Sequence, residues 1–393
     1  MTPAPSSHEG PVEELPRRLT VGVDARTVYA KTRRGTGKNL IDLYGTLARQ
    51  QPDWQFVLFH QRAADDPFAG FANVTARQID IAGDRWNLWQ DVRLPAAAWM
   101  AGLDVLHCPA NLAPLWTKTP TVVTVHDLIP LDLTPNAPDT IAWVDRVTRG
   151  ALRARQVLTP SDYTRQRLIE TLGVAADRIT VNHWAPDQQT HKVDDPAVLH
   201  ALRRKYALPD GVAYILAFGA EDPRKNTPAI VRAWSQVSEA VRRQCHLLIV
   251  GLQPAALGRM QAFANPLVPD GSCRIHGFAD EADMSGLMSG ALALCYPSLL
   301  EGFGLPILDA FICGTPVITS NRTSLPEVAG DAAILVDPGD ITAIGAALSE
   351  VVLSATRRDA LRASGARRAD LFSWDRCART AGAVLARAAR DRG

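Results

Sequence analysis

The sequence predicts an α/β protein made of two doubly wound domains, on the basis of three observations. Short runs of apolar, often β-branched residues recur along the chain, and stretches with helical spacing separate them. Such alternation is typical of parallel sheets with helices on both faces. Several runs end at glycine or polar residues, as strands that lead into a ligand crevice do. Finally, 393 residues with 47% apolar composition are enough for two hydrophobic cores.

Composition argues against several classes of function. The formal net charge is +1, so the chain as a whole lacks the positive excess expected of a nucleic-acid partner. Its six cysteines are scattered, mostly in apolar runs and never as CxxC, which favours buried free thiols over disulfides or zinc. No apolar stretch reaches the ~18–20 residues that a membrane span needs. We therefore expect a cytoplasmic protein without nucleic-acid partners.

The order of the elements predicts five segments. Residues 1–17 are rich in Pro, Ser and Glu and have no apolar core, which predicts a disordered leader rather than a signal peptide. Residues 18–190 form the first predicted domain, and residues 211–373 form the second. The region 191–210 is the expected linker, and 374–393 the expected C-terminal helix.

The first domain opens with a predicted strand at residues 19–23. The segment 33–39 then leads into an amphipathic helical pattern at 40–44, so Gly35 and Gly37 are expected in a turn between strand and helix. Backbone N–H groups at such a corner attract anions. An ordinary tight turn fits the GxG pattern equally well.

Further strands are predicted at residues 56–59, 105–107 and 121–125. The last one, TVVTV, ends at His126. This histidine would then lie at the carboxyl end of a parallel strand, facing the crevice where open α/β sheets bind ligands. A single histidine at a strand end is more often structural than catalytic, so its position leaves both roles open.

The next strand is predicted at residues 157–159, and Ser161 or Asp162 is expected to cap the helix that follows. Basic residues are frequent around this strand and could serve a peripheral membrane attachment, although ordinary solvated helix faces account for them as well. They are Arg149, Arg153, Arg155, Arg165 and Arg167.

The second domain opens with a predicted strand at 214–219, followed by the turn sequence DPRKN. Arg224 and Lys225 in this turn could neutralise a diphosphate, the arginine through its planar fork and the lysine as a point charge. A solvated basic pair is the alternative. Another strand is expected at 247–251.

The stretch CYPSLLEGFGLPILDAFICGTP carries the most specific pattern. A strand at 292–295 precedes a loop that contains Gly302 and Gly304. A helix of about two turns follows, because Pro306 suits a first helical position and Gly314 suits the residue after the last one. The amides at the start of that helix, together with the helix dipole, favour a phosphate.

Two carboxylates flank this loop. Glu301 comes before the glycines, and Asp309 is expected in the first helical turn. A carboxylate accepts two hydrogen bonds at once, so the pair could hold sugar or ribose hydroxyls on either side of a phosphate. Alternatively, Asp309 only stabilises the helix N-terminus and Glu301 is a solvated loop acid.

The run EGFGLPILDAFICGTPVITSNRTSLPEVAGDAAILVDP resembles the nucleotide-sugar signature of retaining glycosyltransferases of the group 1, family 4 type. This resemblance implies the GT-B fold, in which two Rossmann-like domains face a central cleft and the last helix returns toward the first domain. The chain departs from the family pattern at three places. Asp309 replaces the second glutamate, Ala220 stands where many members have arginine, and HWAPD replaces a turn that contains glycine.

The resemblance also implies roles for individual residues. Glu301, and His126 in the VVTVHDLIP segment, would hold the donor sugar as the candidate catalytic residues. The PRKN segment would hold the diphosphate, and the backbone of RIHGF would meet the base. The predicted donor-binding residues are Gly35, Gly37, Arg224, Lys225, His276, Gly277, Phe278, Gly302, Phe303, Gly304, Leu305 and Asp309.

The segments GTGKN, HCPANLAP, VVTVHDLIP, TPSDYTRQRL and PRKN look most like bacterial mannosyltransferases of O-antigen or exopolysaccharide assembly. This implies retaining transfer of mannose from GDP-mannose to a lipid-linked oligosaccharide or other glycan, with peripheral contact at the inner membrane. The family mechanism is a front-face attack in which the leaving phosphate oxygen takes the acceptor proton. No Asp-x-Asp sequence occurs, so we expect neither a metal nor a cofactor.

Three alternatives stay open. The donor could be a UDP-sugar, or the chain could be a nucleotide-sugar 2-epimerase, which shares the two-domain architecture and needs no acceptor. It could also bind a nucleotide sugar for regulation without catalysis. The EGFGLPILDAF run argues against the epimerase, and the presence of Glu301, Lys225 and His126 argues against the non-catalytic protein.

Overall fold

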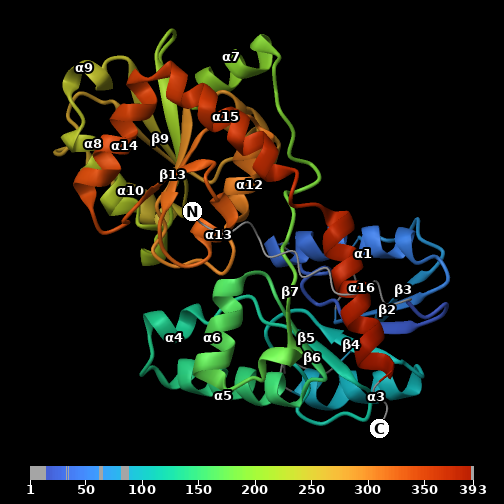
Figure 1. Ribbon diagram of the computed structural model, residues 1–393. Helices are drawn as coiled ribbons and strands as arrows, with labels where there is room; N and C mark the ends of the chain where they lie inside the picture. The colour runs from blue at the N-terminus through green and yellow to red at the C-terminus, as the bar shows by residue number, and fades with distance from the viewer. Residues whose placement is uncertain (1–14, 32, 34, 62–64, 81–87, 391–393) are drawn as a thin grey trace. The chain divides into compact units, whose positions relative to one another are not determined.

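The computed structural model describes residues 15–31, 33, 35–61, 65–80 and 88–390. These residues form two compact units (Figure 1). We call the part up to residue 187 together with 372–390 the N-terminal unit, and 188–371 the C-terminal unit. Each unit is a parallel sheet flanked by helices, which confirms the predicted α/β class. Most of the expected leader, residues 1–14, lies outside the described residues.

The N-terminal unit contains a seven-stranded sheet with the order β3-β2-β1-β4-β5-β6-β7, in which every pairing is parallel. The strand order reverses between β1 and β4, where α/β sheets form their ligand crevice. The strands are β1 (Thr20–Asp24), β2 (Gln55–His60), β3 (Val74–Gln78), β4 (Val105–Cys108), β5 (Thr121–Thr124), β6 (Gln156–Thr159) and β7 (Ile179–Val181).

Successive strand residues point to opposite faces of this sheet, and each face has its own core. Val122 lies in one core and Val123 in the other. The first face is covered by α1 (Gly35–Gln50) and α16 (Trp374–Arg390). The second face is covered by the π-helical turn η1 (Trp89–Arg93), α3 (Leu94–Met100), α5 (Pro138–Arg153) and α6 (Asp162–Leu172), while α4 (Ile129–Leu133) precedes α5.

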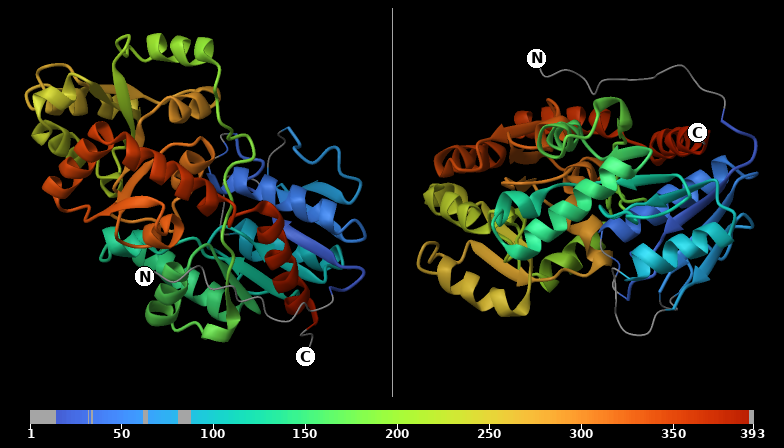
Figure 2. Two further views of the ribbon diagram at one scale, coloured as in Figure 1. Left: turned by 45° about the horizontal axis from the view of Figure 1, so that its top comes forward. Right: turned by 90° about the horizontal axis from the view of Figure 1, so that it is seen from below.

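The C-terminal helix α16 belongs to the N-terminal unit and lies along α1 (Figures 1 and 2). At the start of α16, the indole Nε1 of Trp374 donates to the carbonyl oxygen of Pro186 at 2.7 Å. The side chain of Gln50 donates to the Asp375 carboxylate at 2.9 Å. Gly382 allows close packing, because a Cβ there would lie 3.2 Å from Leu47.

The start of α1 differs from the sequence-based prediction. The helix begins at Gly35, so Gly35 and Gly37 lie in its first turn and not in a turn before it. A Cβ on Gly37 would lie 2.3 Å from the carbonyl oxygen of Thr27, whereas a Cβ on Gly35 would meet nothing within 4 Å. Gly37 is therefore required by the close approach of the helix to the backbone that follows β1. The cap of α6 is as predicted, since Ser161 Oγ accepts from the Thr164 N–H at 3.1 Å.

The C-terminal unit contains a six-stranded parallel sheet with the order β10-β9-β8-β11-β12-β13. Here the strand order reverses between β8 and β11. The strands are β8 (Ala213–Phe218), β9 (Cys245–Leu252), β10 (Cys273–Gly277), β11 (Ala293–Tyr296), β12 (Val317–Ser320) and β13 (Ala333–Val336).

Helices cover both faces of this second sheet. The expected linker region 191–210 contains one of them, α7, and Tyr206 after it donates to the Asp283 carboxylate at 2.7 Å. The α-helices of the unit are α7 (Pro196–Lys205), α8 (Thr227–Gln236), α9 (Glu239–Arg242), α10 (Pro254–Ala264), α11 (Met284–Ser289), α12 (Leu305–Ile312), α13 (Leu325–Ala329), α14 (Ile341–Leu353) and α15 (Ala355–Ala369). Short 3₁₀ turns, η3 (Pro223–Lys225) and η4 (Glu281–Asp283), complete it, and η2 (Ala176–Arg178) lies before β7.

All six cysteines are free thiols, as the sequence predicts. Five are buried, and Cys273 is half-buried. Burial raises the pKa of the Cys295 thiol to about 12, so that thiol stays protonated and unreactive. Within the part of the chain that the structure describes, no helix has both the length and the apolar character required to cross a bilayer.

Candidate active site

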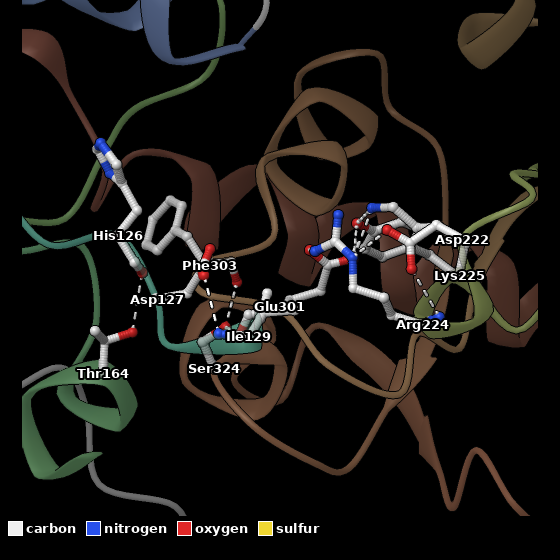
Figure 3. A network of polar contacts seen from close by, with 11 residues as sticks. His126, Asp127, Ile129, Thr164, Asp222, Arg224, Lys225, Glu301, Phe303 and Ser324 are labelled. Carbon is white, nitrogen blue, oxygen red and sulfur yellow. Dashed lines mark hydrogen bonds and ion pairs between the residues drawn. The ribbon is translucent and has the colours of Figure 1, made fainter. Parts of the chain in front are cut away.

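A polar cluster of the C-terminal unit lies in the loops that follow the carboxyl ends of β8 and β11. These strands are neighbours, so the loops that follow them lie side by side. Lys225 Nζ lies 2.7 Å from Glu301 Oε1, and Arg224 Nη1 lies 3.7 Å from Glu301 Oε2 (Figure 3). The glutamate is only 8% exposed. Three residues that the sequence predicted separately therefore form one cluster.

Tyr296, the last residue of β11, is a member of this cluster that the sequence did not reveal. Its hydroxyl donates to Glu301 Oε1 at 2.6 Å and lies 2.7 Å from Lys225 Nζ. Burial and the neighbouring Glu301 carboxylate raise the Tyr296 pKa well above its usual value, so the phenol stays neutral and remains a donor. One carboxylate oxygen of Glu301 is thus held by two donors, and the other faces Arg224.

Two further residues hold the cations of this cluster in position. Asp222 accepts from Arg224 twice, from the backbone N–H at 3.1 Å and from Nε at 2.6 Å. Asn226 is in the left-handed region with φ 58°, and its side-chain amide donates to the carbonyl oxygens of Pro297 and Pro338 at 3.1 and 2.7 Å. The sequence Asp222-Pro223 is a turn signal, and it could have indicated the contact between Asp222 and Arg224. Nothing in the local sequence indicates the contacts of Asn226.

The loop after Glu301 is fixed from behind by Ser324. Its hydroxyl lies 2.9 Å from the Glu301 carbonyl oxygen and 2.8 Å from that of Phe303 (Figure 3). In a trans peptide the N–H points opposite to the carbonyl, so the N–H groups of Gly302 and Gly304 are turned away from Ser324. Gly304 has φ 117°, and a Cβ there would lie 2.6 Å from Leu325 Cδ2, so glycine is required at this position.

Two other predicted donor-binding residues near this loop, Asp309 and Phe303, are not placed as the sequence pattern suggested. Helix α12 begins at Leu305, which makes Asp309 its fifth residue, and no acid lies in its first turn. The prediction of Asp309 in the first turn is therefore wrong, because the helix starts one residue before Pro306. The ring of Phe303 is 6% exposed, so only its backbone is available to a ligand.

The RIHGF segment lies at the end of β10, the edge strand, and β9 separates it from β8. The His276 ring packs edge-on against Tyr206, with 5.5 Å between ring centroids, and burial lowers the His276 pKa. Gly277 ends the strand, and the Phe278 side chain that follows is exposed. Ala220 after β8 offers no cation, and its N–H donates to Thr227 Oγ1 at 3.0 Å.

In the N-terminal unit, His126 follows β5 at the carboxyl edge of the sheet, where the sequence places it. Its Nε2 lies 2.6 Å from the carbonyl oxygen of Pro109. A carbonyl oxygen only accepts, so Nε2 must carry the proton, and in the neutral ring Nδ1 is then an acceptor. Burial lowers the His126 pKa, which favours this neutral form. The ring packs edge-on against Trp184, a residue of the unusual HWAPD segment, at 4.9 Å.

Two residues outside the predicted set hold the backbone of His126. Asn111 Oδ1 accepts from the His126 N–H at 2.7 Å, and the Asn111 N–H donates to the Thr124 carbonyl oxygen at 2.9 Å. Asn111 has φ 65°, a left-handed conformation that asparagine tolerates better than most residues. Thr164 Oγ1 donates to the His126 carbonyl oxygen at 3.1 Å (Figure 3). The histidine is therefore fixed from the loop after β4, from β5 and from α6 together.

A buried polar chain lies beneath His126. His107 Nδ1 lies 2.5 Å from the Tyr44 hydroxyl, and His107 Nε2 lies 2.7 Å from Thr124 Oγ1. Burial, and secondarily His126, lower the His107 pKa to about 3. Between this chain and Trp184 lies a cavity of about 10 Å³, enough for about one water molecule.

The buried His107 should make the protein acid-sensitive. Its folded pKa of about 3 lies below the ordinary 6.5, so between these values the unfolded chain binds one more proton. The free energy of unfolding should therefore fall by about 1.4 kcal/mol per pH unit as the pH drops through this window. In His107→Gln this contribution should be absent, whatever the variant's absolute stability. Urea unfolding followed from pH 7.5 to 4.5 measures both slopes, and equal slopes would contradict the assignment.

The comparisons with known families cover most of the chain. The family described as "Glycosyl transferases group 1" matches residues 200–368, which contain the Glu301 cluster. "Glycosyltransferase Family 4" matches residues 33–185, which contain His126.

Several named proteins are similar in sequence to this chain. The chain is 32% identical over 258 residues to O-antigen chain mannosyltransferase B of Escherichia coli. The aligned region covers 65% of this chain and 67% of that protein. It is 31% identical over 260 residues to the serotype-specific mannosyltransferase WbdA of Escherichia coli, but this match covers only 32% of WbdA. O-antigen chain mannosyltransferase RfbU of Salmonella typhimurium is 26% identical over 221 residues, 56% of this chain and 57% of that protein.

Solved structures share the fold. Sucrose-phosphate synthase from Thermosynechococcus elongatus superposes with a TM-score of 0.74 at 19% identity, covering 92% of this chain and 96% of that one. HepE of Anabaena, solved in complex with UDP and glucose, gives a TM-score of 0.71 at 17% identity, with 93% and 99% coverage. Both family models match the chain, O-antigen chain mannosyltransferase B is 32% identical to it, and the fold is GT-B. The chain therefore belongs to the group 1, family 4 glycosyltransferases.

Proposed function

We propose that the protein transfers mannose from GDP-mannose, with retention of configuration, to a lipid-linked oligosaccharide or other glycan. The observation that carries this proposal is the joint placement of Arg224, Lys225 and Glu301 at the carboxyl ends of β8 and β11. Two cations and a carboxylate at a strand-order reversal suit a diphosphate attached to a hydroxyl-rich sugar. The mannosyltransferase names of the relatives support the choice of mannose.

The cations would act on the leaving group. Negative charge develops on the diphosphate as its bond to the sugar carbon breaks, and Arg224 and Lys225 would stabilise it. The N–H group of Gly304, turned away from Ser324, would add to this stabilisation. As the phosphates draw the cations toward themselves, Glu301 would exchange part of its contact with them for sugar hydroxyls.

The transfer would occur on one face of the sugar. The acceptor hydroxyl oxygen forms a bond to the anomeric carbon as the bond to the phosphate oxygen breaks, and that phosphate oxygen takes the hydroxyl proton. In this proposal no step requires a metal, since Arg224 and Lys225 would neutralise the diphosphate. A covalent intermediate would need a carboxylate behind the anomeric carbon, whereas Glu301 is assigned to the sugar hydroxyls.

His126 would contact the donor sugar through its unprotonated Nδ1. Because Pro109 holds the proton on Nε2, Nδ1 can accept a hydrogen bond from a sugar hydroxyl. Its lowered pKa keeps it an acceptor at neutral pH.

We propose a cytoplasmic location with peripheral membrane contact, because the proposed acceptor is lipid-linked. The sequence-predicted arginines support this contact unequally. Arg149 pairs with Asp145, and Arg167 lies 2.5 Å from Asp132, so the guanidinium groups of both are already paired with carboxylates. Arg153 and Arg155 are exposed.

Thermal unfolding with GDP, UDP, ADP and TDP, each with and without Mg²⁺, tests the donor assignment. A ligand at ~100 times its Kd adds about 2.7 kcal/mol to native-state stability, which raises the melting temperature measurably. We expect GDP alone to raise it, without a requirement for Mg²⁺. A rise with UDP alone would replace GDP-mannose by a UDP-sugar, and no rise with any nucleotide would contradict the site. Conversion of GDP-mannose without an acceptor would instead indicate an epimerase.

A further inference from the structure

The strands of the N-terminal sheet begin at the end of the sheet opposite to the one that bears His126. We call this end, formed by the amino-terminal ends of the strands, the amino edge. Large apolar side chains are exposed there. Trp99 is 69% exposed, Met100 74% and Trp116 73%. Trp99 and Met100 end α3 shortly before β4, and Trp116 lies shortly before β5. The entry points of β4 and β5 are adjacent, since the Leu106 N–H donates to the Pro120 carbonyl oxygen. These three side chains therefore gather at one edge.

Exposed cations surround them at the same edge. Strands β1, β4, β5 and β6 are consecutive in the sheet, and basic residues lie within three residues of the start of β1, β5 and β6. The guanidinium carbon of Arg153 lies 4.7 Å from the Trp116 ring centroid, which joins the two kinds of side chain. We call this set the amino-edge surface: Trp99, Met100, Trp116, Arg17, Arg18, Lys118, Arg153 and Arg155.

Cations outnumber carboxylates in the segments that lead into these four strands. In the segments 15–19, 99–104, 115–120 and 152–155, which lead into the four strands, Asp104 is the sole carboxylate among the described residues. It is half-buried, and its carboxylate accepts from the Thr20 N–H at 2.9 Å. Within the described chain, the five cations of the surface form no ion pair. The net charge of the whole sequence is only +1, so this concentration is local.

We infer that the amino-edge surface binds an anionic lipid bilayer. Tryptophan and methionine side chains insert at the boundary between headgroups and acyl chains, and tryptophan is enriched there. Basic residues near an anionic membrane surface strengthen the binding electrostatically. A nucleic-acid duplex, whose bases are already stacked, would use the cations but leave the apolar Met100 without a partner. The combination of apolar and cationic side chains therefore fits a bilayer of anionic lipids best.

The amino-edge surface and the candidate catalytic residue His126 lie at opposite ends of the strands of the same sheet. His126 follows the carboxyl end of β5, whereas Trp116 and Lys118 precede its amino end. A bilayer at the amino edge would leave the carboxyl edge of the same sheet uncovered. Binding should therefore be independent of nucleotide, and the inference stands whether or not GDP-mannose is the donor.

Co-sedimentation of the full chain with vesicles tests the inference. We expect binding to vesicles of phosphatidylcholine mixed with phosphatidylglycerol, weak binding to phosphatidylcholine alone, and a loss of binding as salt screens the charges. Brominated lipids should quench the tryptophan fluorescence of bound protein. Added GDP should leave the bound fraction unchanged.

Two double variants and two matched controls locate the contact. Trp99→Ser with Trp116→Ser, and Arg153→Glu with Arg155→Glu, should each weaken vesicle binding at least tenfold. Leu353→Ser, an equally exposed apolar residue at the end of α14, and Arg204→Glu, an exposed arginine of α7, should bind like the wild type. Melting temperatures of all variants report whether each one folds.

Two results would overturn the inference. One is wild-type protein that does not bind anionic vesicles, or folded surface variants that bind them as well as the wild type does. The other is wild-type self-association, seen by sedimentation velocity, that the surface variants abolish without any change in vesicle binding. That result would identify the amino-edge surface as a contact between protein copies.

Discussion

Replacing Glu301 by glutamine should lower the rate of sugar transfer by about 10²–10³-fold, the range expected when one preorganised contact to a transition state is removed. Glutamine keeps the shape of the side chain, and its carbonyl oxygen can still accept from Lys225 or Tyr296. However, its NH₂ group cannot accept a hydrogen bond, and the neutral side chain no longer offsets the two nearby cations. The sugar should therefore lose its acceptor while the diphosphate keeps its cations.

Two quantities are measured for the wild type and for Glu301→Gln: the rate of sugar transfer, and the Kd for free GDP by calorimetry. Transfer should fall while the Kd for GDP stays within a few-fold of the wild-type value. Glu350→Gln is the matched control, because Glu350 is an exposed acid that pairs with Arg357 in the same unit and should have no effect. Near-normal turnover of Glu301→Gln would remove Glu301 from the mechanism. Parallel loss of turnover and GDP binding would show that it shapes the site without acting on the sugar.

Replacing Lys225 by methionine should weaken binding of the nucleoside diphosphate by about 10–100-fold, or about 1.4–2.8 kcal/mol. This is the range expected for a charge-assisted hydrogen bond. Methionine fills the space of the lysine stem, so the loss reflects the ammonium group. The change also removes one of the two donors to Glu301 Oε1, so transfer should fall further than binding does.

Titration with GDP and with guanosine separates these effects. Guanosine lacks phosphates and should bind wild type and Lys225→Met equally. Lys192→Met is the control, since Lys192 is an exposed lysine of the same unit that pairs with Asp194. If guanosine and GDP lose the same affinity in Lys225→Met, the lysine does not contact the diphosphate.

The sequence alone predicts those features that depend on local periodicity and capping. The alternation of strands and helices indicates both sheets, and the run TVVTV places His126 at a strand end. Ser161 is a cap because its side chain and the Thr164 N–H are close in sequence. The EGFG loop and the helix after it are equally local.

Features that depend on which strands are neighbours are absent from the local pattern. Tyr296 reaches Glu301 and Lys225 only because β8 and β11 are adjacent, and the order of elements along the chain does not specify this pairing. Asn111 holds His126 for the same reason, through the pairing of β4 with β5. The wrong position of Asp309 has another cause: α12 starts at Leu305, and the rule for Pro306 allows either of the first two helical positions.

The structure shows what surrounds two of the positions at which the chain departs from the family pattern, Ala220 and the HWAPD segment. Ala220 leaves the start of the loop after β8 without a cation, and Arg224, held by Asp222, is the arginine that lies beside Glu301. The HWAPD segment places Trp184 against the His126 ring. We expect Arg224 to serve in place of the arginine that the family usually carries after this strand.

The most direct test of the proposed function is the anomeric configuration of the product made by the full chain. The reaction contains GDP-mannose, a synthetic mannoside on a lipid tail as acceptor, and EDTA, and proton NMR identifies the new linkage. Because the mannose of GDP-mannose is α-linked, we predict an α-linked product that forms in EDTA and is lost in Glu301→Gln. A β-linked product, or transfer that requires added metal, would contradict the account.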